Sequence, residues 1–568
     1  MSAAPSFPDR FNLADYYLFD RLGEGLGGKV CLRFGAHAYT YDDVARRTRA
    51  FAAVLAGADV RRGERVLLVL PDVPPFAWVF FGVLARGCVV AMGNPDSPIE
   101  SLAYLVDYTR ATAVVTVPRV ARALAERAKA AGARSEVRRV WCVPEAAAFS
   151  GAVDPAGPCE PGGGAFHDLA TELAAAGKGA DGAEGTGGAD GTGGADGAVL
   201  VTHRDEPAIW LFTSGSTGEP KANVHSHRDF AFNTEVYAKG TVGYARGDVS
   251  VSVPRLYFGY ATGTNLMFPF AVGATVALFS ERPTPESLAT AIATYRPTVV
   301  TNVPTMLGKL LDHDQALRDA GKPGLDFSCI RFSLSAGEAL PEALLRRWLE
   351  RFHSDVYDGI GSAEMFHIYA SNRPGDVKPG SLGRAVEGYE LRILPEEAEG
   401  PGAAPVPAGE IGVLWVKGDS VSHGYWMDRD KSWRVFHGHW CRTGDLFRID
   451  EEGYLTFAGR ADELLKVSGL WVAPVEVEEC LMRHEAVLHA AVIGVEEEGL
   501  LKTKAFVVLR SGARADGDLG AELQEFVKAR LAKHKYPRIV EFVDDLPKND
   551  RGKVDRKVLR ARERDRAK

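Results

Sequence analysis

The sequence has few cysteines, and none of them are spaced to bind a metal or build a disulfide framework. The seven cysteines are scattered and include no CxxC pair, whereas zinc sites and disulfide-rich folds need closely spaced cysteines. The sequence also has no large excess of positive or negative charge, since 75 acidic and 67 basic residues give a net charge of −8. This balance does not indicate a nucleic-acid partner. We therefore expect reduced thiols and a cytoplasmic protein that binds no nucleic acid.

The sequence lacks a long uninterrupted apolar run, and we expect no signal peptide. Its N-terminus has no basic segment followed by an apolar one. The most apolar region, residues 66–92, is interrupted by three prolines and two charged residues, and a membrane helix needs about 20 consecutive apolar residues. Buried strands and a helix are the expected structure there, and no membrane partner is expected.

Short β-rich runs alternate with longer helical patterns over the first 460 residues. With 568 residues, 46% hydrophobic and 25% charged, the chain is long enough for at least two globular domains. Buried strands are expected at the apolar runs 65–70, 111–117, 208–212 and 297–303. This alternation predicts a large N-terminal α/β domain, residues 1–460, with mostly parallel sheets and covering helices.

The composition changes in two places. Residues 175–198 are rich in glycine, alanine and aspartate and have almost nothing to bury, so we expect a disordered surface insert in the large domain. Beyond residue 460, three short strand patterns follow in turn with two helix patterns. They predict a small α+β C-terminal domain over residues 461–568.

The stretch TSGSTGEPK, residues 213–221, has the composition of an anion-binding loop. Its glycines allow backbone amides to turn toward an anion, its hydroxyls add donors, and Lys221 adds a positive charge. The spacing differs from GxxxxGK[ST], and Pro220 is foreign to that motif, so this is not the P-loop of nucleotide hydrolases. A plain turn is the other interpretation, but the position of Lys221 favours a loop that binds phosphates.

Six motifs follow one another along the chain, namely TSGSTGEPK (213–221), SLSAGEALP (333–341), DGIGSAE (358–364), WCRTGD (440–445), GRADELLKVSG (459–469) and PKNDRGKVDR (547–556). They occur in the order found in the acyl-adenylate-forming superfamily of acyl-CoA synthetases, peptide-synthetase adenylation domains and luciferases. The chain resembles this superfamily over nearly its whole length, and its motifs are most similar to those of the benzoate-CoA ligase branch. The resemblance implies ATP-dependent activation of an aromatic carboxylic acid to the aryl-AMP, then transfer to the thiol of coenzyme A with release of AMP and pyrophosphate.

The resemblance assigns the nucleotide site residue by residue. Attack of a carboxylate on the α-phosphate concentrates negative charge on phosphoryl oxygens, so positioned cations matter more than a base. Lys553 would bridge the carboxylate and the α-phosphate, Lys221 would bind the outer phosphates, and Glu364 would ligate Mg²⁺. The other implied ATP and AMP contacts are Thr213, Ser214, Gly215, Ser216, Thr217 and Gly218 at the phosphates, Gly337, Glu338 and Asp358 at the adenine, and Asp445 and Arg460 near the ribose.

The resemblance also implies an aromatic pocket and a mobile C-terminal domain. In this superfamily the small domain swivels between the two half-reactions. Asp462 matches the hinge position, and Ser468 and Gly469 belong to the stretch that would approach the pantetheine thiol. The residues implied to line the pocket are Gly259, Tyr260, His367 and Ile368 around the ring, and Lys466 near the carboxylate.

Four positions depart from the residues expected in close benzoate ligases. Gly259 stands in place of alanine and Ala261 in place of glycine, so the pocket is expected to admit a substituted or longer aryl acid, such as an amino- or hydroxybenzoate or a cinnamate. Ala222 replaces glycine and Ala363 replaces threonine. Loss of that hydroxyl removes a donor to phosphate, which predicts weaker handling of ATP.

Other acceptors and another class of protein remain alternatives at this point. The activated acid could pass to a carrier-protein thiol, or nitrite could be adenylated and captured by an aryl amine, as in diazotase-like offshoots. A regulatory nucleotide-binding protein without turnover is the third alternative, and the presence of Lys221, Glu364, Asp445 and Lys553 argues against it. The sequence leaves the oligomeric state open, a dimer included.

Overall fold

The structure is a computed structural model of the chain, which describes most of its residues. Helix α6 (Leu169–Ala180) includes residues 175–180 of the predicted insert, which are therefore helical and not disordered, and residues 181–197 of the insert lie outside the described residues. The described ranges are 5–131, 136–145, 166–180, 198–214, 219–338, 340–467, 470–497, 500–510, 512–513, 518–547 and 554–566.

The chain divides into two compact units. Unit 1 comprises Met1–Glu390 and Val416–Cys441, and unit 2 comprises Leu391–Trp415 and Arg442–Lys568. Unit 1 contains two sheets that are mostly parallel, and unit 2 contains smaller sheets that are mostly antiparallel. The predicted large α/β part and small α+β part are therefore confirmed, whereas a domain boundary at residue 460 stays a prediction.

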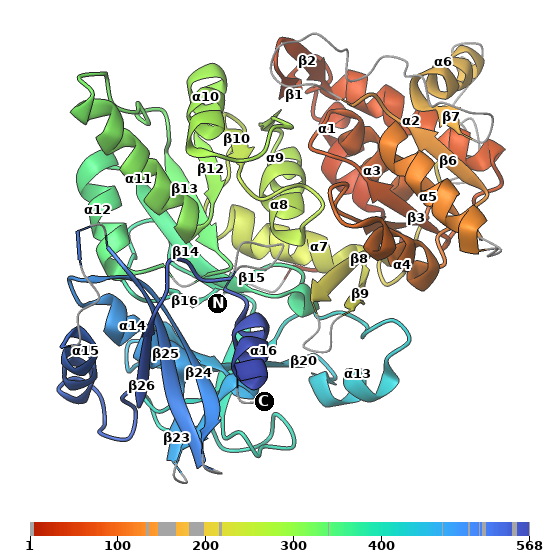
Figure 1. Cartoon of the computed structure of the whole chain (residues 1–568). Helices are drawn as coiled ribbons and strands as arrows, with labels where there is room; N and C mark the ends of the chain where they lie inside the picture. Colours follow the sequence, from red (N-terminus) through yellow and green to blue (C-terminus); the bar gives the residue numbers. More distant parts are fainter. Residues whose placement is uncertain are drawn as a thin grey trace. The chain divides into compact units, whose positions relative to one another are not determined.

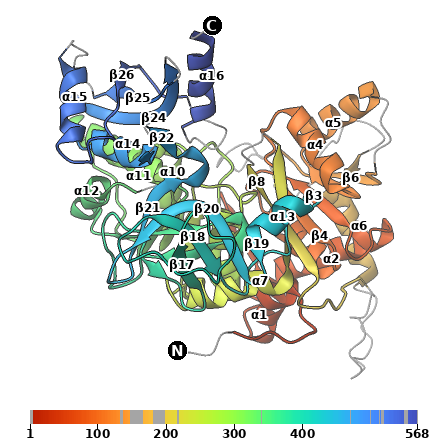
Figure 2. The ribbon, with the colours of Figure 1, turned by 90° about the horizontal axis from the view of Figure 1, so that it is seen from below.

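A seven-stranded sheet in unit 1 has the order β7-β6-β5-β3-β4-β8-β9. All pairs are parallel except the hairpin β8–β9, and the red and orange helices surround its strands (Figure 1 and Figure 2). Helix α3 is buried at all of its residues, and the inner strands β3, β4 and β5 are apolar and buried over nearly all of their length because both faces of the sheet are covered. The elements are β3 (Arg65–Val69), α3 (Pro75–Ala85), β4 (Val89–Met92), α4 (Ile99–Thr109), β5 (Ala113–Thr116), α5 (Pro118–Ala131), β6 (Arg139–Cys142), β7 (His167–Asp168), β8 (Pro207–Ser214) and β9 (Pro220–Ser226).

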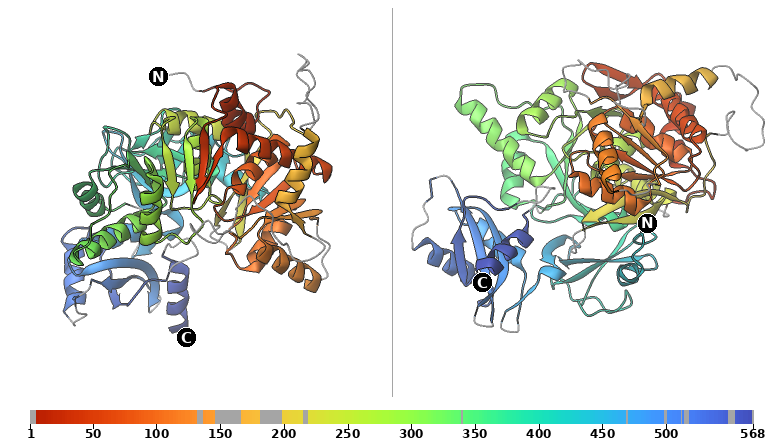
Figure 3. Two further views of the ribbon diagram at one scale, coloured as in Figure 1. Left: turned by 90° about the horizontal axis from the view of Figure 1, so that it is seen from above. Right: turned by 45° about the vertical axis from the view of Figure 1, so that its right-hand side comes forward.

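A nine-stranded sheet in unit 1 has the order β16-β15-β14-β13-β12-β10-β11-β1-β2. The six strands from β14 to β1 are parallel to their neighbours, and the left view of Figure 3 shows the red N-terminal strands beside the green ones. Ligand sites in such sheets lie outside the carboxyl ends of the strands. The strands are β1 (Val30–Phe34), β2 (His37–Thr40), β10 (Val249–Ser252), β11 (Thr275–Leu278), β12 (Val299–Asn302), β13 (Phe332–Ala336), β14 (Asp355–Gly361), β15 (Ile368–Ser371) and β16 (Arg384–Ala385).

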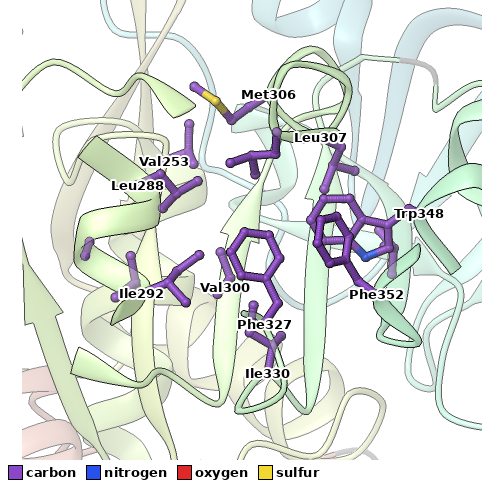
Figure 4. Packing of buried hydrophobic residues seen from close by; sticks show 14 of the residues in the cluster. Val253, Leu288, Ile292, Val300, Met306, Leu307, Phe327, Ile330, Trp348 and Phe352 are labelled. Carbon is purple, nitrogen blue, oxygen red and sulfur yellow. The ribbon is translucent and has the colours of Figure 1, made fainter. Parts of the chain in front are cut away.

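Helices α10, α11 and α12 lie side by side on this sheet and bury an apolar cluster (Figure 1). The rings of Phe327, Trp348 and Phe352 meet at its centre, with centroids 4.6 Å apart for the two phenylalanines (Figure 4). This packing fixes the strands whose carboxyl ends carry the site described below. The helices of unit 1 not given above are α1 (Asp20–Gly23), α2 (Tyr41–Gly57), α7 (His227–Asn233), α8 (Gly259–Thr262), α9 (Phe268–Ala271), α10 (Pro285–Tyr295), α11 (Pro304–Asp319), α12 (Glu342–Phe352) and α13 (Arg429–Val435).

Unit 2 is built from a three-stranded sheet with helices beside it and from further strand pairs. Helix α14 packs on β24, and α15 packs on β26 (Figure 2). Leu523 and Val527 of α15 are fully buried in the core of this sheet. The elements are β17 (Glu390–Leu394), β18 (Gly412–Lys417), β20 (Trp440–Ile449), β21 (Leu455–Arg460), β22 (Leu465–Val467), β23 (Leu470–Val472), α14 (Pro474–Met482), β24 (Val487–Glu497), β25 (Leu500–Leu509), α15 (Leu519–Lys528), β26 (Ile539–Phe542) and α16 (Arg556–Arg566).

No helix in the described part of the chain is long and apolar enough to span a membrane. The cytoplasmic location stays a prediction.

Candidate functional site

The hairpin β8–β9 presents the predicted phosphate loop. Thr213 on β8 pairs with Lys221 on β9, and Ser214 pairs with Pro220. Gly215, Ser216, Thr217 and Gly218 lie outside the described residues, and their contacts with phosphate stay a prediction. The register nevertheless places a threonine and a lysine opposite each other where the hairpin turns.

Lys221 forms an ion pair with Asp428, a residue that sequence reasoning missed. Burial alone would raise the pKa of Asp428, but hydrogen bonds from Lys221 and from the backbone of Lys431 outweigh it and hold that pKa below its usual value. Both side chains are only about one-quarter exposed. Together they line a cavity of about 320 Å³ with Tyr104, Tyr108, Glu219, Trp426 and Met427.

Glu364 is held by Tyr425, which lies three residues before Asp428. The hydroxyl of Tyr425 donates a hydrogen bond to Oε1 of Glu364 at 2.8 Å. Burial, and then the negative charge of Glu364, raise the pKa of Tyr425 far above its ordinary range, so the phenol keeps its proton. The backbone amide of Ser422 donates to the carbonyl of Glu364 at 2.9 Å. The carboxylate is thereby oriented from the side chain and from its own backbone.

The segment 422–428 is itself fastened to β9. The amide of Trp426 donates to the carbonyl of Ala222 at 2.9 Å, and the amide of Val224 donates to the carbonyl of Gly424 at 3.0 Å. This added strand-like segment contacts Glu364 through Tyr425 and Lys221 through Asp428. One short segment therefore holds both the predicted phosphate-binding cation and the predicted metal ligand. The sequence signal was weak: an acidic and aromatic run, GYWMD, outside any recognised motif.

A buried histidine–aspartate pair supports the residue before Glu364. His225 contacts the carbonyl of Ala363 with Nε2 at 2.7 Å and Oδ2 of Asp229 with Nδ1 at 2.9 Å. The carbonyl of Ala363 only accepts, so Nε2 is the donor of that hydrogen bond. Asp229 also accepts from the amide of Ser226 at 3.0 Å. Ala363, which lacks the expected hydroxyl, is thus held through its backbone.

Four of the predicted pocket residues come from two segments, with Gly259 and Tyr260 at the start of α8, His367 just before β15 and Ile368 at its first position. Nε2 of His367 donates to the carbonyl of Tyr260 at 3.0 Å, and Ile368 is buried on β15. The side chain of Leu211 lies close to Gly259, because a Cβ on this glycine would lie 3.2 Å from Cδ1 of Leu211. The space that glycine leaves is therefore filled by Leu211.

The predicted adenine residues follow neighbouring parallel strands. Asp358 lies on β14 and is buried, and this burial raises its pKa to about 8. Gly337 follows β13 with a φ of +89°, which suits glycine. Glu338 accepts from the backbone amide of Thr305 at 3.2 Å and from its hydroxyl at 2.7 Å, and its carboxylate so caps the start of α11.

In unit 2 the two predicted ribose residues face each other. Asp445 on β20 pairs in register with Arg460 on β21, and the guanidinium donates to Oδ1 of Asp445 at 2.8 Å. Asp462 lies in a 3₁₀ turn and Lys466 on β22. Ser468, Gly469 and Lys553 lie outside the described residues, so the predicted roles of all these residues stay predictions.

The segment on either side of Lys553 is anchored by its neighbours. The amide of Asp555 donates to the carbonyl of Pro547 at 2.7 Å. Arg556, at the start of α16, pairs with buried Glu478 at 2.7 Å and with Glu463 at 3.5 Å. These pairs fix both ends of the lysine-bearing stretch within unit 2.

Comparison with known proteins agrees with this arrangement. A family model described as "AMP-binding enzyme" matches residues 19–426, and one described as "AMP-binding enzyme C-terminal domain" matches residues 476–553. The chain belongs to the AMP-binding enzyme family. This AMP-binding enzyme is 38% identical over 560 residues to a benzoate–CoA ligase of Thauera aromatica, covering 98% of this chain and 97% of the relative. The resemblance to the benzoate-CoA ligase branch is thus confirmed.

Solved structures give the same result for this AMP-binding enzyme. The crystal structure of the anthranilate CoA ligase AuaEII in complex with anthranoyl-AMP has a TM-score of 0.82 at 29% identity and covers 98% of both chains. A benzoate CoA ligase from Burkholderia xenovorans LB400 has a TM-score of 0.79 at 35% identity, covering 97% of this chain and 100% of the other. The fold of this AMP-binding enzyme is therefore shared over its whole length with these enzymes.

Proposed function

We propose that the protein is an acid–thiol ligase that activates an aromatic carboxylic acid with ATP. The acid becomes the aryl-AMP with release of pyrophosphate, and the aryl group then passes to the thiol of coenzyme A with release of AMP. The observation that carries the proposal is the segment 422–428, which contacts both Lys221 and Glu364. The full-length similarity to benzoate– and anthranilate–CoA ligases supports the acid and the acceptor.

The residues divide the first half-reaction between them. Lys221 and the loop 213–218 bind the outer phosphates, while Lys553 neutralises charge between the attacking carboxylate and the α-phosphate. An oxygen of the carboxylate bonds to the α-phosphorus as the bond to pyrophosphate breaks. Asp445 accepts hydrogen bonds from the ribose hydroxyls, for which it exchanges its present contact with Arg460.

The second half-reaction breaks the bond between the acyl carbon and the AMP oxygen. The thiol sulfur attacks the acyl carbon, its proton leaves to solvent, and AMP departs as a phosphate anion. Gly469 allows the pantetheine arm to approach the backbone closely. In this proposal the small C-terminal domain, residues 461–568, moves about Asp462 between the two steps.

Glu364 fits a magnesium site of the kind that nucleotide enzymes use. Among the described residues no group of three or more His, Cys, Asp or Glu could hold a metal by itself. Mg²⁺ needs no such group, because it takes one or two carboxylates together with phosphate oxygens and water. Bound there, it would neutralise charge on the phosphates. Glu364 is half-buried and one of its oxygens is already oriented by Tyr425.

The test is release of AMP from ATP by the purified protein with benzoates, cinnamates and nitrite, each with and without coenzyme A. We expect release with an aryl acid that depends on coenzyme A. Release that coenzyme A does not accelerate indicates a carrier protein as acceptor, and release with nitrite indicates the diazotase-like reaction. No release with any acid contradicts the proposal.

A further inference from the structure

Two tyrosines of α4, Tyr104 and Tyr108, stack on each other beside the Lys221–Asp428 ion pair. Their ring planes are 11° apart and their centroids lie 5.2 Å apart. Residues four apart lie on the same face of a helix, so both hydroxyls can reach the same neighbouring segments. Both tyrosines line the cavity of about 320 Å³ that Lys221 and Asp428 also line.

The hydroxyl of Tyr104 holds the backbone directly before Lys221. It donates to the carbonyl of Pro220, the first residue of β9, at 3.1 Å. This carbonyl belongs to the same peptide group as the amide of Lys221, and a peptide group is planar. The hydrogen bond therefore restrains the peptide plane from which Lys221 extends.

The hydroxyl of Tyr108 holds the neighbours of both members of the ion pair. It donates to the carbonyl of Trp426 at 2.7 Å and accepts from the amide of Ala222 at 3.4 Å. In return, the indole Nε1 of Trp426 donates to the carbonyl of Tyr108 at 3.1 Å. This carbonyl lies in the last turn of α4, where helix carbonyls lack partners within the helix. One phenol thus contacts the residue after Lys221 and the residue two positions before Asp428.

Both phenols are donors at neutral pH. Burial raises the pKa of Tyr104 and that of Tyr108 above the ordinary value for tyrosine. Backbone carbonyls only accept, so the direction of both hydrogen bonds to them is fixed. These bonds matter for Lys221 because a lysine ammonium is carried by a flexible four-carbon stem, and its reach depends on where the backbone is held.

We propose that Tyr104 and Tyr108 are positioning residues for the adenylation step, which hold the backbone at Lys221 so that its ammonium meets the phosphates of ATP. The inference rests on the proposed function in one respect, namely that Lys221 binds phosphate. The outer phosphates leave as pyrophosphate in the first half-reaction, so the two tyrosines should act in that half-reaction only. Loss of one neutral hydrogen bond corresponds to about threefold to tenfold in affinity.

The first test compares the two half-reactions in Tyr104→Phe and Tyr108→Phe, which lose a hydroxyl and keep the ring. Aryl-AMP formation is measured with the acid that gives the fastest AMP release, and thioester formation is measured from synthetic aryl-AMP and coenzyme A. We expect KM for ATP to rise by about threefold to tenfold in each variant, with KM for the acid and the rate of thioester formation unchanged. An unchanged KM for ATP in either variant, or equal slowing of both half-reactions, overturns the inference.

Tyr295→Phe is the matched control for loss of a tyrosine hydroxyl. The hydroxyl of Tyr295 also donates to a carbonyl, that of Leu278 at 3.0 Å, and accepts from an amide, that of Gly35 at 2.6 Å. Leu278 ends β11 and Gly35 follows β1, so these contacts lie on other strands than β8 and β9. We expect the wild-type KM for ATP in this variant. A rise as large as that in Tyr108→Phe would assign the effect to general loss of structure and overturn the inference.

A double-mutant cycle tests whether Tyr104 acts through Lys221. The affinity for ATP is measured by titration calorimetry without an acid, so that no turnover occurs. Tyr104→Phe should weaken ATP binding in the wild type and have little further effect in Lys221→Ala, because the group that it positions is then absent. Additive effects of the two substitutions, an unchanged affinity in Lys221→Ala, or no binding of ATP to the wild type overturns the inference.

Calorimetry also separates this inference from the proposed function. ATP binding that depends on Tyr104 through Lys221, without AMP release from any acid, supports the positioning role and contradicts the ligase reaction. AMP release by a protein whose affinity for ATP does not respond to either tyrosine supports the ligase reaction and overturns the positioning role.

Discussion

The hydroxyl of Tyr425 donates to Oε1 of Glu364, and the residue three positions later in the chain, Asp428, pairs with Lys221. A single loop thus orients the carboxylate proposed to bind Mg²⁺ and restrains the cation proposed to bind phosphate. The two contacts should have opposite effects on ligand binding. The hydrogen bond from Tyr425 orients Glu364 for Mg²⁺, whereas the ion pair with Asp428 occupies Lys221, which the phosphates need. Separate substitutions can therefore test them.

Tyr425→Phe should weaken the use of Mg²⁺. The substitution removes one hydrogen bond to a charged group, worth about 1.5–3 kcal/mol, and residues that orient a metal ligand typically change metal affinity by about 10- to 100-fold. We expect the Mg²⁺ concentration for half-maximal AMP release to rise by about tenfold or more. Tyr357→Phe is the control, because its hydroxyl donates to Asp355 at 3.2 Å at the other end of β14. An unchanged Mg²⁺ requirement in Tyr425→Phe counts against Glu364 as the ligand.

Asp428→Asn should improve the apparent affinity for ATP. The phosphates must displace Asp428 from Lys221, and a partly exposed ion pair is worth up to about 1 kcal/mol, so KM for ATP should fall by about threefold to fivefold. Asparagine still caps α13, where the side chain of Asp428 accepts from the amide of Lys431 at 3.2 Å. Asp430→Asn, an exposed change two residues away, should leave KM unchanged. A higher KM in Asp428→Asn means that Asp428 supports ATP binding instead of competing with it.

The buried carboxyl of Asp358 predicts a pH-dependent stability. Its pKa rises from 3.8 to about 8 on folding because of burial. The folded state therefore holds a proton that the unfolded state releases between these values, so Asp358 makes folding less favourable as pH rises through this window, by about 1.4 kcal/mol per pH unit at most. Asp358→Asn removes this term. Its midpoint of thermal unfolding should rise relative to the wild type between pH 5 and pH 8 and stay level above pH 8. Parallel curves would show that Asp358 is ionised in the folded protein.

Some of this site is visible in the sequence, because it is encoded by neighbouring residues. The glycines, hydroxyls and lysine of 213–221 lie within nine consecutive residues, so their chemistry can be interpreted locally. Tyr425 and Asp428 lie 61 and 207 residues away from their partners, so only the fold brings them there. Phe366 has a φ of +66°. The neighbouring sequence does not predict this conformation, since phenylalanine is not a residue that favours positive φ.

The predicted acyl pocket also shows what sequence cannot reveal. Gly259 in place of an expected alanine suggests added room, but Leu211 lies against that position. A glycine reveals that a side chain is missing and does not reveal what fills the space.

Lys553→Ala should separate the two half-reactions. The lysine is proposed to neutralise charge only while the carboxylate attacks the α-phosphate, so its removal should reduce aryl-AMP formation by about 10²–10³. Thioester formation from synthetic aryl-AMP and coenzyme A should proceed at close to the wild-type rate. This second step involves no attack on the α-phosphate, because pyrophosphate leaves in the first half-reaction. Lys557→Ala, an exposed lysine on α16, is the matched control and should leave both rates unchanged. If both half-reactions slow equally in Lys553→Ala, the lysine acts through the structure of unit 2, where Arg556 and Glu478 anchor the segment beside it.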